Sequence, residues 1–383
     1  MTETDLLIIG AGPYGLATAS YARRLGLDCV VVGDPMSFWR DHMPSGMLLR
    51  SPTSWHLDAV GELTFEKFVS ERGLTPEDVS PISLSLYLEY CRWFQEGSEL
   101  EVRRNFVRNL RWTEGLTLPF TATLEDGAEI CARRALSATG LTHYRNIPED
   151  VASLLPRQKF AHTCDLVDFS GLKDKRCAIV GGRQSAFEWA ALINEEAGAD
   201  IHIIYRHDTP AFTESDWDWI DDLMDRTRES PGWFKELSAG ERDRIYQRLW
   251  GEGRLKLEPW LQPRIQGDNV HLWPNTRITG ARLNGDGSTA LSLDDGSALN
   301  VDQTILATGY RVEVAREPYL RDPSITRNLR VEEGFPVLDS RFQSSIPGLY
   351  FTGQTATRDF GPFFGFGIGC PPAAWIIGNA LSR

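Results

Sequence analysis

The chain has 383 residues, of which 42% are hydrophobic and 24% are charged, and its formal net charge is −13. This length suits two domains with their own cores, and the composition excludes a disordered or fibrous protein. The acidic surplus would repel nucleic-acid phosphates and anionic lipids, so we expect small-molecule ligands and neither a nucleic-acid nor a membrane partner.

A glycine-rich turn follows the first apolar segment. Residues 6–9 form a short apolar run, typical of a parallel strand buried on both faces, and they lead into Gly10, Gly12 and Gly15 at the spacing G-x-G-x-x-G. Apolar residues then recur with helical period, so the positive end of a helix would face the turn. Gly10 permits the tight turn, Gly12 a close approach of the backbone to a phosphate, and Gly15 the packing of helix on strand. We predict a dinucleotide-binding turn, with a purely structural turn as the alternative.

The second predicted strand, residues 28–32, ends at Gly33 and Asp34. An acid at such a place holds the adenosine ribose in dinucleotide folds, although here it stands one residue late. Asp34 is therefore either a ribose ligand or a turn aspartate. Residues 37–57 are rich in Pro, Ser, Trp and Arg, and we expect them to form a long loop across the cofactor.

Three stretches, GAGPYG at 10–15, FWR at 38–40 and GMLLRS at 46–51, resemble the flavin-containing monooxygenase superfamily, nearest to its N-hydroxylating branch of lysine and ornithine N-monooxygenases. In that superfamily the first turn binds FAD and the following loop runs beside the flavin. The resemblance therefore adds these candidate flavin neighbours to the turn: Pro13, Trp39, Arg40, Leu49, Arg50 and Ser51, of which Arg50 is also a catalytic candidate. Core packing is the alternative for Trp39 and Leu49.

The next segments predict helices at 65–72 and 83–94, the second with Ser83 as its N-cap, and then strands at 100–104, 108–112, 118–124 and 129–137. This part ends in Ala138-Thr139-Gly140, whose small residues let the chain pass close to a cofactor. We expect Thr139 and Gly140 to contact it.

The second half of the chain repeats the landmarks of the first. Residues 177–180 lead into a second turn at Gly181, and an acidic-glycine hairpin and an Ala-Thr-Gly stretch recur as well, each 169–171 residues after its counterpart. Three landmarks in one register predict two related nucleotide-binding units.

Arg183 replaces the second glycine of the second turn. Its side chain either blocks a pyrophosphate or pairs with it through its charge. The following Gln184 and Ser185 match the superfamily's turn, where the resemblance places them beside the nicotinamide nucleotide. After the next strand, residues 201–204, Arg206 stands where a ribose-binding acid is usual, which favours NADPH over NADH.

The segment 213–262 contains five tryptophans and two predicted helices, 216–228 and 239–250, the second opened by a capping box of Ser238 and Glu241. In N-hydroxylating monooxygenases a helical segment in this place closes over the substrate. A cap that only buttresses the domains is the alternative. Upstream, His162 resembles the histidine of a degenerate superfamily linker, or is simply a hydrogen-bonded histidine.

The C-terminal part returns to the first unit. The strand 303–306 leads into an ATGY signature of the superfamily with Thr308 and Gly309, and the strand from 349 ends at Gly353 and Gln354, which we expect beside the FAD. An aromatic tail follows. We predict that Phe360, Phe363 and Phe364 line a substrate pocket, with Asp359 as an acid/base group or amine anchor, or else in a salt bridge with Arg358.

The predicted fold is α/β, with two Rossmann-like domains, the second inserted in the first, and a helical Trp-rich segment. The FAD domain comprises 1–168 and 302–383, and the NADPH domain 169–301, including the helical segment 213–262. The resemblance implies an enzyme in which NADPH reduces FAD, oxygen adds at the flavin C4a position, and a small-molecule nucleophile, with an amine nitrogen favoured, is oxygenated.

Three alternatives remain open: a Baeyer–Villiger-type oxygenase, an NAD(P)H-dependent flavin reductase or oxidase, and a non-catalytic nucleotide-binding redox sensor. No C-x-x-C pair or metal-ligand spacing occurs among the six cysteines, so we expect reduced thiols and no metal. With no signal peptide and no apolar run of membrane-spanning length, we expect a cytoplasmic protein. A homo-oligomer is left open.

Overall fold

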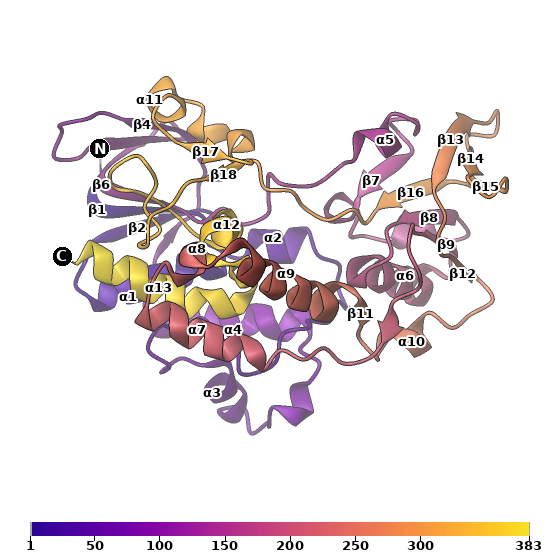
Figure 1. Cartoon of the computed structure of the whole chain (residues 1–383), viewed down its shortest axis with the longest axis horizontal. Coiled ribbons are helices and arrows are strands. Elements are labelled where there is room, and N and C mark those ends of the chain that lie inside the picture. Colours follow the sequence, from indigo (N-terminus) through magenta and orange to yellow (C-terminus); the bar gives the residue numbers. More distant parts are fainter. Residues whose placement is uncertain (1, 383) are drawn as a thin grey trace.

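Two separate sheets organise the computed structural model, which describes residues 2–382 (Figure 1). The first has the order β3-β2-β1-β6-β5-β4, and β19 joins it by pairing with β6. Its strands are β1 (Thr2–Ile9), β2 (Cys29–Val32), β3 (Val102–Arg103), β4 (Val107–Trp112), β5 (Phe120–Leu124), β6 (Glu129–Ser137) and β19 (Leu349–Phe351). Strands β1, β2, β3, β6 and β19 are parallel to their neighbours in this group, whereas β4 and β5 form an antiparallel extension. Both ends of the chain therefore build this first unit.

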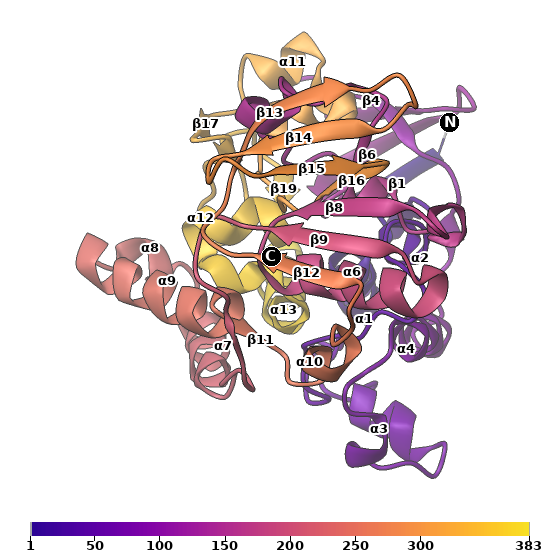
Figure 2. The same ribbon diagram turned by 90° about the vertical axis from the view of Figure 1, so that its right-hand side faces the viewer.

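The second sheet is entirely parallel, in the order β12-β9-β8-β16-β7 (Figure 2). Its strands are β7 (Phe160–His162), β8 (Arg176–Val180), β9 (Asp200–Ile204), β12 (Val270–Trp273) and β16 (Gln303–Leu306). A three-stranded antiparallel meander covers one of its faces and consists of β13 (Ile278–Leu283), β14 (Thr289–Leu293) and β15 (Ala298–Val301). Buried apolar side chains such as Ile201 and Ile203 fill the other face, under helix α6, as a sheet covered on both sides requires. We call this sheet, its meander and α6 the second unit.

The predicted fold class is confirmed, but the sheet pairing differs from the predicted domain boundaries. Strand β7 precedes the boundary expected after residue 168, and β16 follows the one expected before residue 302, yet both pair with the second sheet. The motifs on which the boundaries relied lie after these strands, because a Rossmann-like unit carries its loops at the carboxyl ends of its strands. The second unit therefore extends from β7 to β16.

Most helices begin or end within a few residues of the predicted bounds. They are α1 (Pro13–Arg24), α2 (Ser37–Asp41), α3 (Phe65–Ser70), α4 (Leu84–Gly97), α5 (Glu149–Ala152), α6 (Gln184–Ala197), α7 (Trp219–Glu229), α8 (Trp233–Glu236), α9 (Ala239–Arg254), α10 (Leu261–Arg264), α11 (Pro323–Thr326), α12 (Thr357–Phe360) and α13 (Cys370–Leu381). The side chain of Ser83 caps α4, as predicted, by accepting a hydrogen bond from the N–H of Leu86. Helix α2 lies where only loop was expected. Two-residue strands β10 (Ala211–Phe212), β11 (Lys256–Leu257), β17 (Val331–Glu332) and β18 (Phe335–Pro336) complete the described structure.

The helical segment packs on the first unit, and not on the second to which it was assigned from the sequence (Figure 1). Trp217, Trp233 and Phe234 are buried in the core of the first unit. The rings of Trp233 and Phe363 stack with centroids 6.4 Å apart, so the C-terminal tail supplies the surface on which α8 rests. Helix α9 opens with the predicted capping box of Ser238 and Glu241 and runs from the first unit toward the second.

The two crossings between the units lie side by side. Arg145 and Tyr310 form an isolated antiparallel bridge, and the N–H of Asn146 donates to the carbonyl oxygen of Gly309 at 2.9 Å. The N–H of Arg311 donates in turn to Tyr144 at 2.7 Å. The outgoing and returning segments are thus hydrogen-bonded to each other. No helix within residues 2–382 combines the length and the apolarity that crossing a membrane requires.

Candidate functional site

A first cavity of about 520 Å³ opens at the carboxyl ends of β1, β2, β6 and β19. Ligands bind at this edge of parallel sheets because the connecting loops meet there. Eleven of the predicted site residues line it: Gly10, Gly12, Pro13, Asp34, Trp39, Ser51, Thr139, Gly140, Gly353, Gln354 and Phe364. The hydroxyl of Thr352, also in the lining, is buried without a hydrogen-bond partner among the described residues.

The three glycines of the first turn differ in what surrounds them. A Cβ on Gly10 would lie 2.4 Å from the carbonyl oxygen of Ala138, and one on Gly15 would lie 2.0 Å from that of Gly10. Gly15 thus serves packing and does not line the cavity. A Cβ on Gly12 would meet nothing within 4 Å, and Gly12 caps α1 without any side-chain hydrogen bond to the first turn. The turn therefore leaves open space at an uncapped helix N-terminus, which fits a dinucleotide pyrophosphate.

Two predicted flavin neighbours lie behind the lining. Arg40 hydrogen-bonds to the carboxylate of Asp34 and to that of Asp41, so it positions Asp34 and does not itself face the cavity. Leu49 is 6% exposed and pairs its N–H with the carbonyl oxygen of Ile82 at 2.8 Å, which agrees with the core-packing alternative.

A second cavity of about 650 Å³ opens at the carboxyl ends of β7, β8, β9 and β16. The predicted residues Gly181, Arg183, Ser185, Arg206, Thr308 and Gly309 line it. A Cβ on Gly181 would lie 2.4 Å from the carbonyl oxygen of Ala307, which repeats the relation of Gly10 to Ala138. Gln184 does not line the cavity, because its amide bonds to the N–H of Glu258 at 3.2 Å and to the carboxylate of Glu188 at 3.3 Å.

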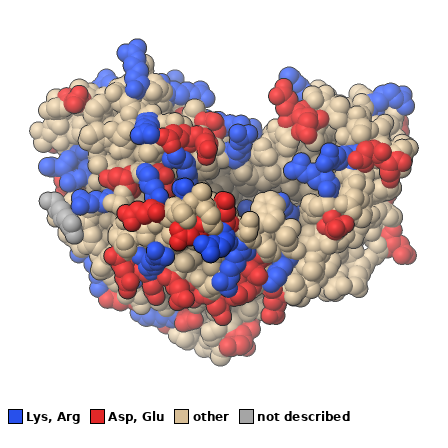
Figure 3. Space-filling view, in the orientation of Figure 1, with Lys and Arg blue, Asp and Glu red and all other residues tan. Residues whose placement is uncertain are grey.

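The second cavity is strongly positive. Arg183, Arg206, Arg254 and Arg277 line it, and none of them has a carboxylate within 4.0 Å in the described part of the chain. The guanidinium of Arg183 lies 3.8 Å from the ring centre of Trp250, and burial, followed by the charges of Arg254 and Arg206, lowers its pKa to about 10. In Figure 3 the surface is hollowed between the two units, with Lys and Arg side chains at the rim. The chemistry of this lining fits a ligand with several phosphate groups.

Sequence reasoning missed Trp250, Arg254 and Arg277 at this cavity. They lie 67 to 94 residues after Arg183 in segments without a motif, so no local signal marks them. Trp250 and Arg254 stand on α9, whose docking decides their position.

The two cavities meet at three apolar side chains, since Phe38, Met43 and Leu141 line both. A ligand in one cavity can therefore touch a ligand in the other. Near this junction the rings of Phe38 and Tyr310 lie 5.9 Å apart, and Tyr310 lies 5.3 Å from the ring of His162. Nε2 of His162 pairs with the carbonyl oxygen of Gly309 at 3.0 Å, and burial lowers the pKa of this histidine, as for a hydrogen-bonded linker residue.

Neither catalytic candidate faces a cavity. Asp359 is 5% exposed and accepts hydrogen bonds from the N–H of Leu338 at 2.7 Å and from Arg358 at 3.2 Å, so it holds the tail in place. Arg50 donates to Glu258 at 2.7 Å and to the carbonyl oxygen of Gly253 at 2.8 Å, and thereby fastens the end of α9 to the loop at 46–51. Both lie outside the lining, because their charges are already paired within the protein.

The aromatic tail contributes one of its three predicted pocket residues. Phe364 lines the first cavity, whereas Phe360 and Phe363 are buried in the core at 2% and 0% exposure. The tail is fixed to the glycine turn, because the hydroxyl of Tyr14 donates to the carbonyl oxygen of Phe364 at 2.6 Å. Gln354 adds a hydrogen bond from its amide to Gly365 at 3.2 Å, a role for which a neutral side chain suffices.

A buried carboxylate beside the first cavity carries no sequence signal. Glu317 is 1% exposed, and its Oε1 accepts a hydrogen bond from the hydroxyl of Thr139 at 2.7 Å. Its Oε2 lies 3.7 Å from Nε2 of His143 and has no hydrogen-bond partner within the described structure. Burial raises the pKa of Glu317 above its ordinary value.

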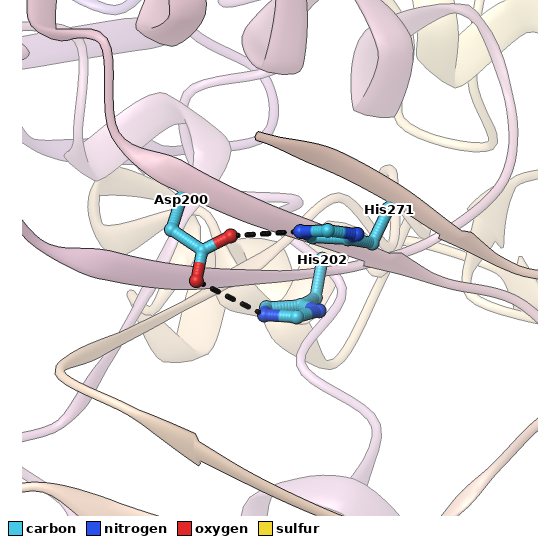
Figure 4. A group of neighbouring side chains, drawn as sticks. All are labelled: Asp200, His202 and His271. Atoms are coloured by element: carbon cyan, nitrogen blue, oxygen red, sulfur yellow. Dashed lines mark hydrogen bonds and ion pairs between the residues drawn. The ribbon is translucent and has the colours of Figure 1, made fainter. Parts of the chain in front are cut away.

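Asp200, His202 and His271 form a cluster on the second sheet, outside both cavities (Figure 4). Nε2 of His202 and Nε2 of His271 face the two carboxylate oxygens at 3.6 and 3.0 Å. The indole N–H of Trp273 donates to Nδ1 of His202 at 3.1 Å, so the neutral imidazole carries its proton on Nε2. That nitrogen is then a donor to Asp200 and no metal ligand, and we assign the cluster no ion.

The sequence model of one protein family, pyridine nucleotide-disulphide oxidoreductase, matches residues 4–232. The chain belongs to this family. It is thus an oxidoreductase, although the disulphide half of the family's name has no counterpart here, since all six cysteines are free and none lines either cavity in the described chain.

A curated relative within reach of this oxidoreductase is the FAD-dependent urate hydroxylase of Xanthomonas campestris pv. campestris, 30% identical over 222 residues, which are 53% of this chain and 45% of that protein. The chain spans about half the length of the first curated relatives it matches.

Among solved structures, the ornithine N-hydroxylase of Kutzneria sp. 744, with reduced FAD, NADP⁺ and L-ornithine, has a TM-score of 0.81 at 16% identity, with 100% and 99% of the two chains covered. The L-lysine 6-monooxygenase of Pseudomonas syringae has a TM-score of 0.74 at 18% identity, with 99% of each chain covered. The resemblance to the N-hydroxylating branch is confirmed, and at these identities it concerns the fold.

Proposed function

We propose that this oxidoreductase is an FAD-dependent, NADPH-using monooxygenase that oxygenates a small-molecule nucleophile, with an amine nitrogen favoured. The observation that carries the proposal is the pair of cavities, one at each glycine turn, that share Phe38, Met43 and Leu141. Two dinucleotides seated there would bring their reactive rings together. The likeness to N-hydroxylases that cover the whole chain supports the choice of reaction.

FAD is assigned to the first cavity. The open space over Gly12 and the uncapped start of α1 would receive its pyrophosphate, and Asp34, fixed by Arg40, would accept hydrogen bonds from its ribose. When bound, the flavin supplies the oxygen-activating chemistry. The protein's own part is to orient the reactants and exclude water, for which the buried tail around Phe364 forms a wall.

NADPH is assigned to the second cavity, where Arg206 would pair with the 2′-phosphate. Because NADH lacks this phosphate, we expect Arg206→Ala to weaken binding of NADPH by about tenfold or more and that of NADH much less. Titration calorimetry with both nucleotides measures this difference, with Arg157→Ala, at an exposed arginine outside both cavities, as the control. Equal losses for the two nucleotides would remove the assignment.

The reaction class is tested on the purified holoenzyme. A yellow protein that consumes NADPH and oxygen, and whose release of hydrogen peroxide falls when an amine is added, supports the monooxygenase. A panel of amines, with ketones and thioethers as comparison, identifies the nucleophile. Suppression of peroxide by ketones alone would instead indicate a Baeyer–Villiger reaction.

An NADPH-dependent flavin reductase or oxidase is the second candidate. It is favoured by one observation, that Asp359 and Arg50 lie outside both cavities, so neither predicted acid/base group reaches the junction. Hydride transfer between two cofactors needs no such group. Peroxide release equal to NADPH consumption with every compound in the panel would support this candidate over the monooxygenase.

A further inference from the structure

The second cavity is bounded by a helix that is packed on the first unit. Trp250 and Arg254, in the last turns of α9, line the cavity, whereas Arg183 and Arg206 come from the second unit itself. The end of α9 is held on the first unit's side by Arg50, which donates to the carbonyl oxygen of Gly253 at 2.8 Å. The lining is therefore assembled from both units.

Arg183 occupies the position at which the first turn has Gly12. It is the N-cap residue of α6, with an extended backbone at φ −121° and no side-chain hydrogen bond to the helix. Its guanidinium reaches α9, where it lies 3.8 Å from the ring centre of Trp250. A cation held on an aromatic face keeps its hydrogen-bond donors free at the ring edge.

Arg183, Arg206 and Arg254 face one another without a carboxylate within 4.0 Å among the described residues. Like charges brought together in a partly buried site disfavour each other's charged forms, as the lowered pKa of Arg183 also indicates. A protein retains such a group at a cost in stability unless an anion neutralises it. The site is therefore built for a multiply charged ligand.

We propose that Arg183 and Arg254 form a two-sided clamp on the pyrophosphate of the pyridine dinucleotide, so that the bound nucleotide ties α9 to α6. The inference rests on the proposed binding of NADPH in this cavity. In this arrangement the charge of Arg183 replaces the close backbone approach that a glycine would allow, and Trp250 holds the guanidinium ready. Arg183 thus assists the nucleotide and does not block it.

The clamp is tested by calorimetric titration of NADP⁺ into the FAD-loaded enzyme. Arg183→Gly restores the glycine of the usual turn, and Arg254→Ala removes the contribution of α9. We expect each to weaken NADP⁺ binding by about tenfold or more, as for loss of a hydrogen bond to a charged group. Arg183→Lys, which keeps the charge but not the planar stack, should fall between, and Arg244→Ala, at an exposed position on α9, should change the affinity less than twofold.

Hydrogen exchange gives a second measurement that does not depend on activity. NADP⁺ should slow exchange in the last turn of α9, residues 249–254, in the parent enzyme and in Arg244→Ala, and should leave it unchanged in Arg254→Ala. Affinity that stays equal or rises in Arg183→Gly would show that Arg183 blocks the site and would overturn the clamp. Failure of the parent enzyme to bind either NADP⁺ or NADPH would overturn the proposed function and the clamp with it.

Discussion

Gly12 and Arg183 occupy the same position in two copies of one turn, and they show which residues of such a turn serve the fold and which serve the ligand. The glycines that precede them, Gly10 and Gly181, would each press a Cβ against a carbonyl oxygen at 2.4 Å. Gly12 has nothing within 4 Å of where its Cβ would be. The protein itself gains nothing from the missing side chain of Gly12, so its purpose is room for a ligand.

We therefore predict that Gly12→Ala leaves folding intact and removes FAD. Its φ of −82° suits any residue, so the free energy of unfolding of the flavin-free protein should change by less than about 0.5 kcal/mol. The added methyl would occupy the space of the pyrophosphate, and the absorbance of bound flavin after purification should fall. Gly171→Ala, also in open space, is the control. A full complement of flavin in Gly12→Ala would contradict this interpretation of the turn.

Glu317 provides a second prediction for a single residue. Its pKa is raised in the folded protein, so its contribution to stability is fully present below the unfolded pKa of 4.5 and is lost as pH rises through the folded value. Glu317→Gln removes this loss. We expect the melting temperature of the variant, relative to the parent, to increase between pH 4.5 and 8. Glu114→Gln, at an exposed position, is the control and should show no such trend.

Among the elements, the helical segment shows where sequence patterns stop being informative. Its two main helices and the capping box at Ser238 were predictable, because a helix and its cap depend on residues within a few positions of each other. The surface against which the segment packs was not, because that surface is the tail around Phe363, about a hundred residues away in the chain. Arg50 was misassigned for the same reason, since its partner Glu258 lies 208 residues further on.

The ion pair of Arg50 with Glu258 should matter for the docking of this segment. The two side chains are 16% and 7% exposed, so Arg50→Met would leave Glu258 buried without its cation. We expect the free energy of unfolding, measured by urea denaturation, to fall by about 3 kcal/mol, and the double variant Arg50→Met/Glu258→Met to regain part of it.

An exposed ion pair on the same segment serves as the reference. Arg248 and Asp216 are each about half exposed and lie 3.1 Å apart. Arg248→Met should cost less than about 1 kcal/mol in the same assay. Equal losses in Arg50→Met and Arg248→Met would show that burial of the first pair is energetically unimportant.

At the scale of the whole molecule, the decisive feature is the junction of the two cavities. The fold and the two glycine turns could be predicted, because they follow from short motifs that recur at a fixed separation. The junction could not, because Phe38, Met43 and Leu141 are ordinary apolar residues that only the relative placement of the two units brings together. The same placement leaves Asp359 in the core and brings Arg254 to the nucleotide site.

Leu141→Trp should close the junction without emptying either cavity. We expect FAD content and NADP⁺ affinity to remain near those of the parent, and reduction of the flavin by NADPH, followed by stopped-flow absorbance, to slow by at least about tenfold, because a displacement of about 1 Å between reacting atoms has an effect of this order. Dithionite, which needs no second cavity, should still reduce the flavin. Leu141→Met is the matched control, and unchanged reduction by NADPH in Leu141→Trp would place the route of the hydride elsewhere.

The hydrogen-bonded crossings at 144–146 and 309–311 have a consequence for how such a protein can be rearranged. Because the outgoing and returning strands of chain adjoin, the second unit could be excised as a cassette with a short join across the gap. The same excision would remove α7 to α9, however, and strip the host of the tryptophans that cover its C-terminal tail. Each half thus carries a part that the other needs, and recombination that exchanged one without the other would leave an apolar scar.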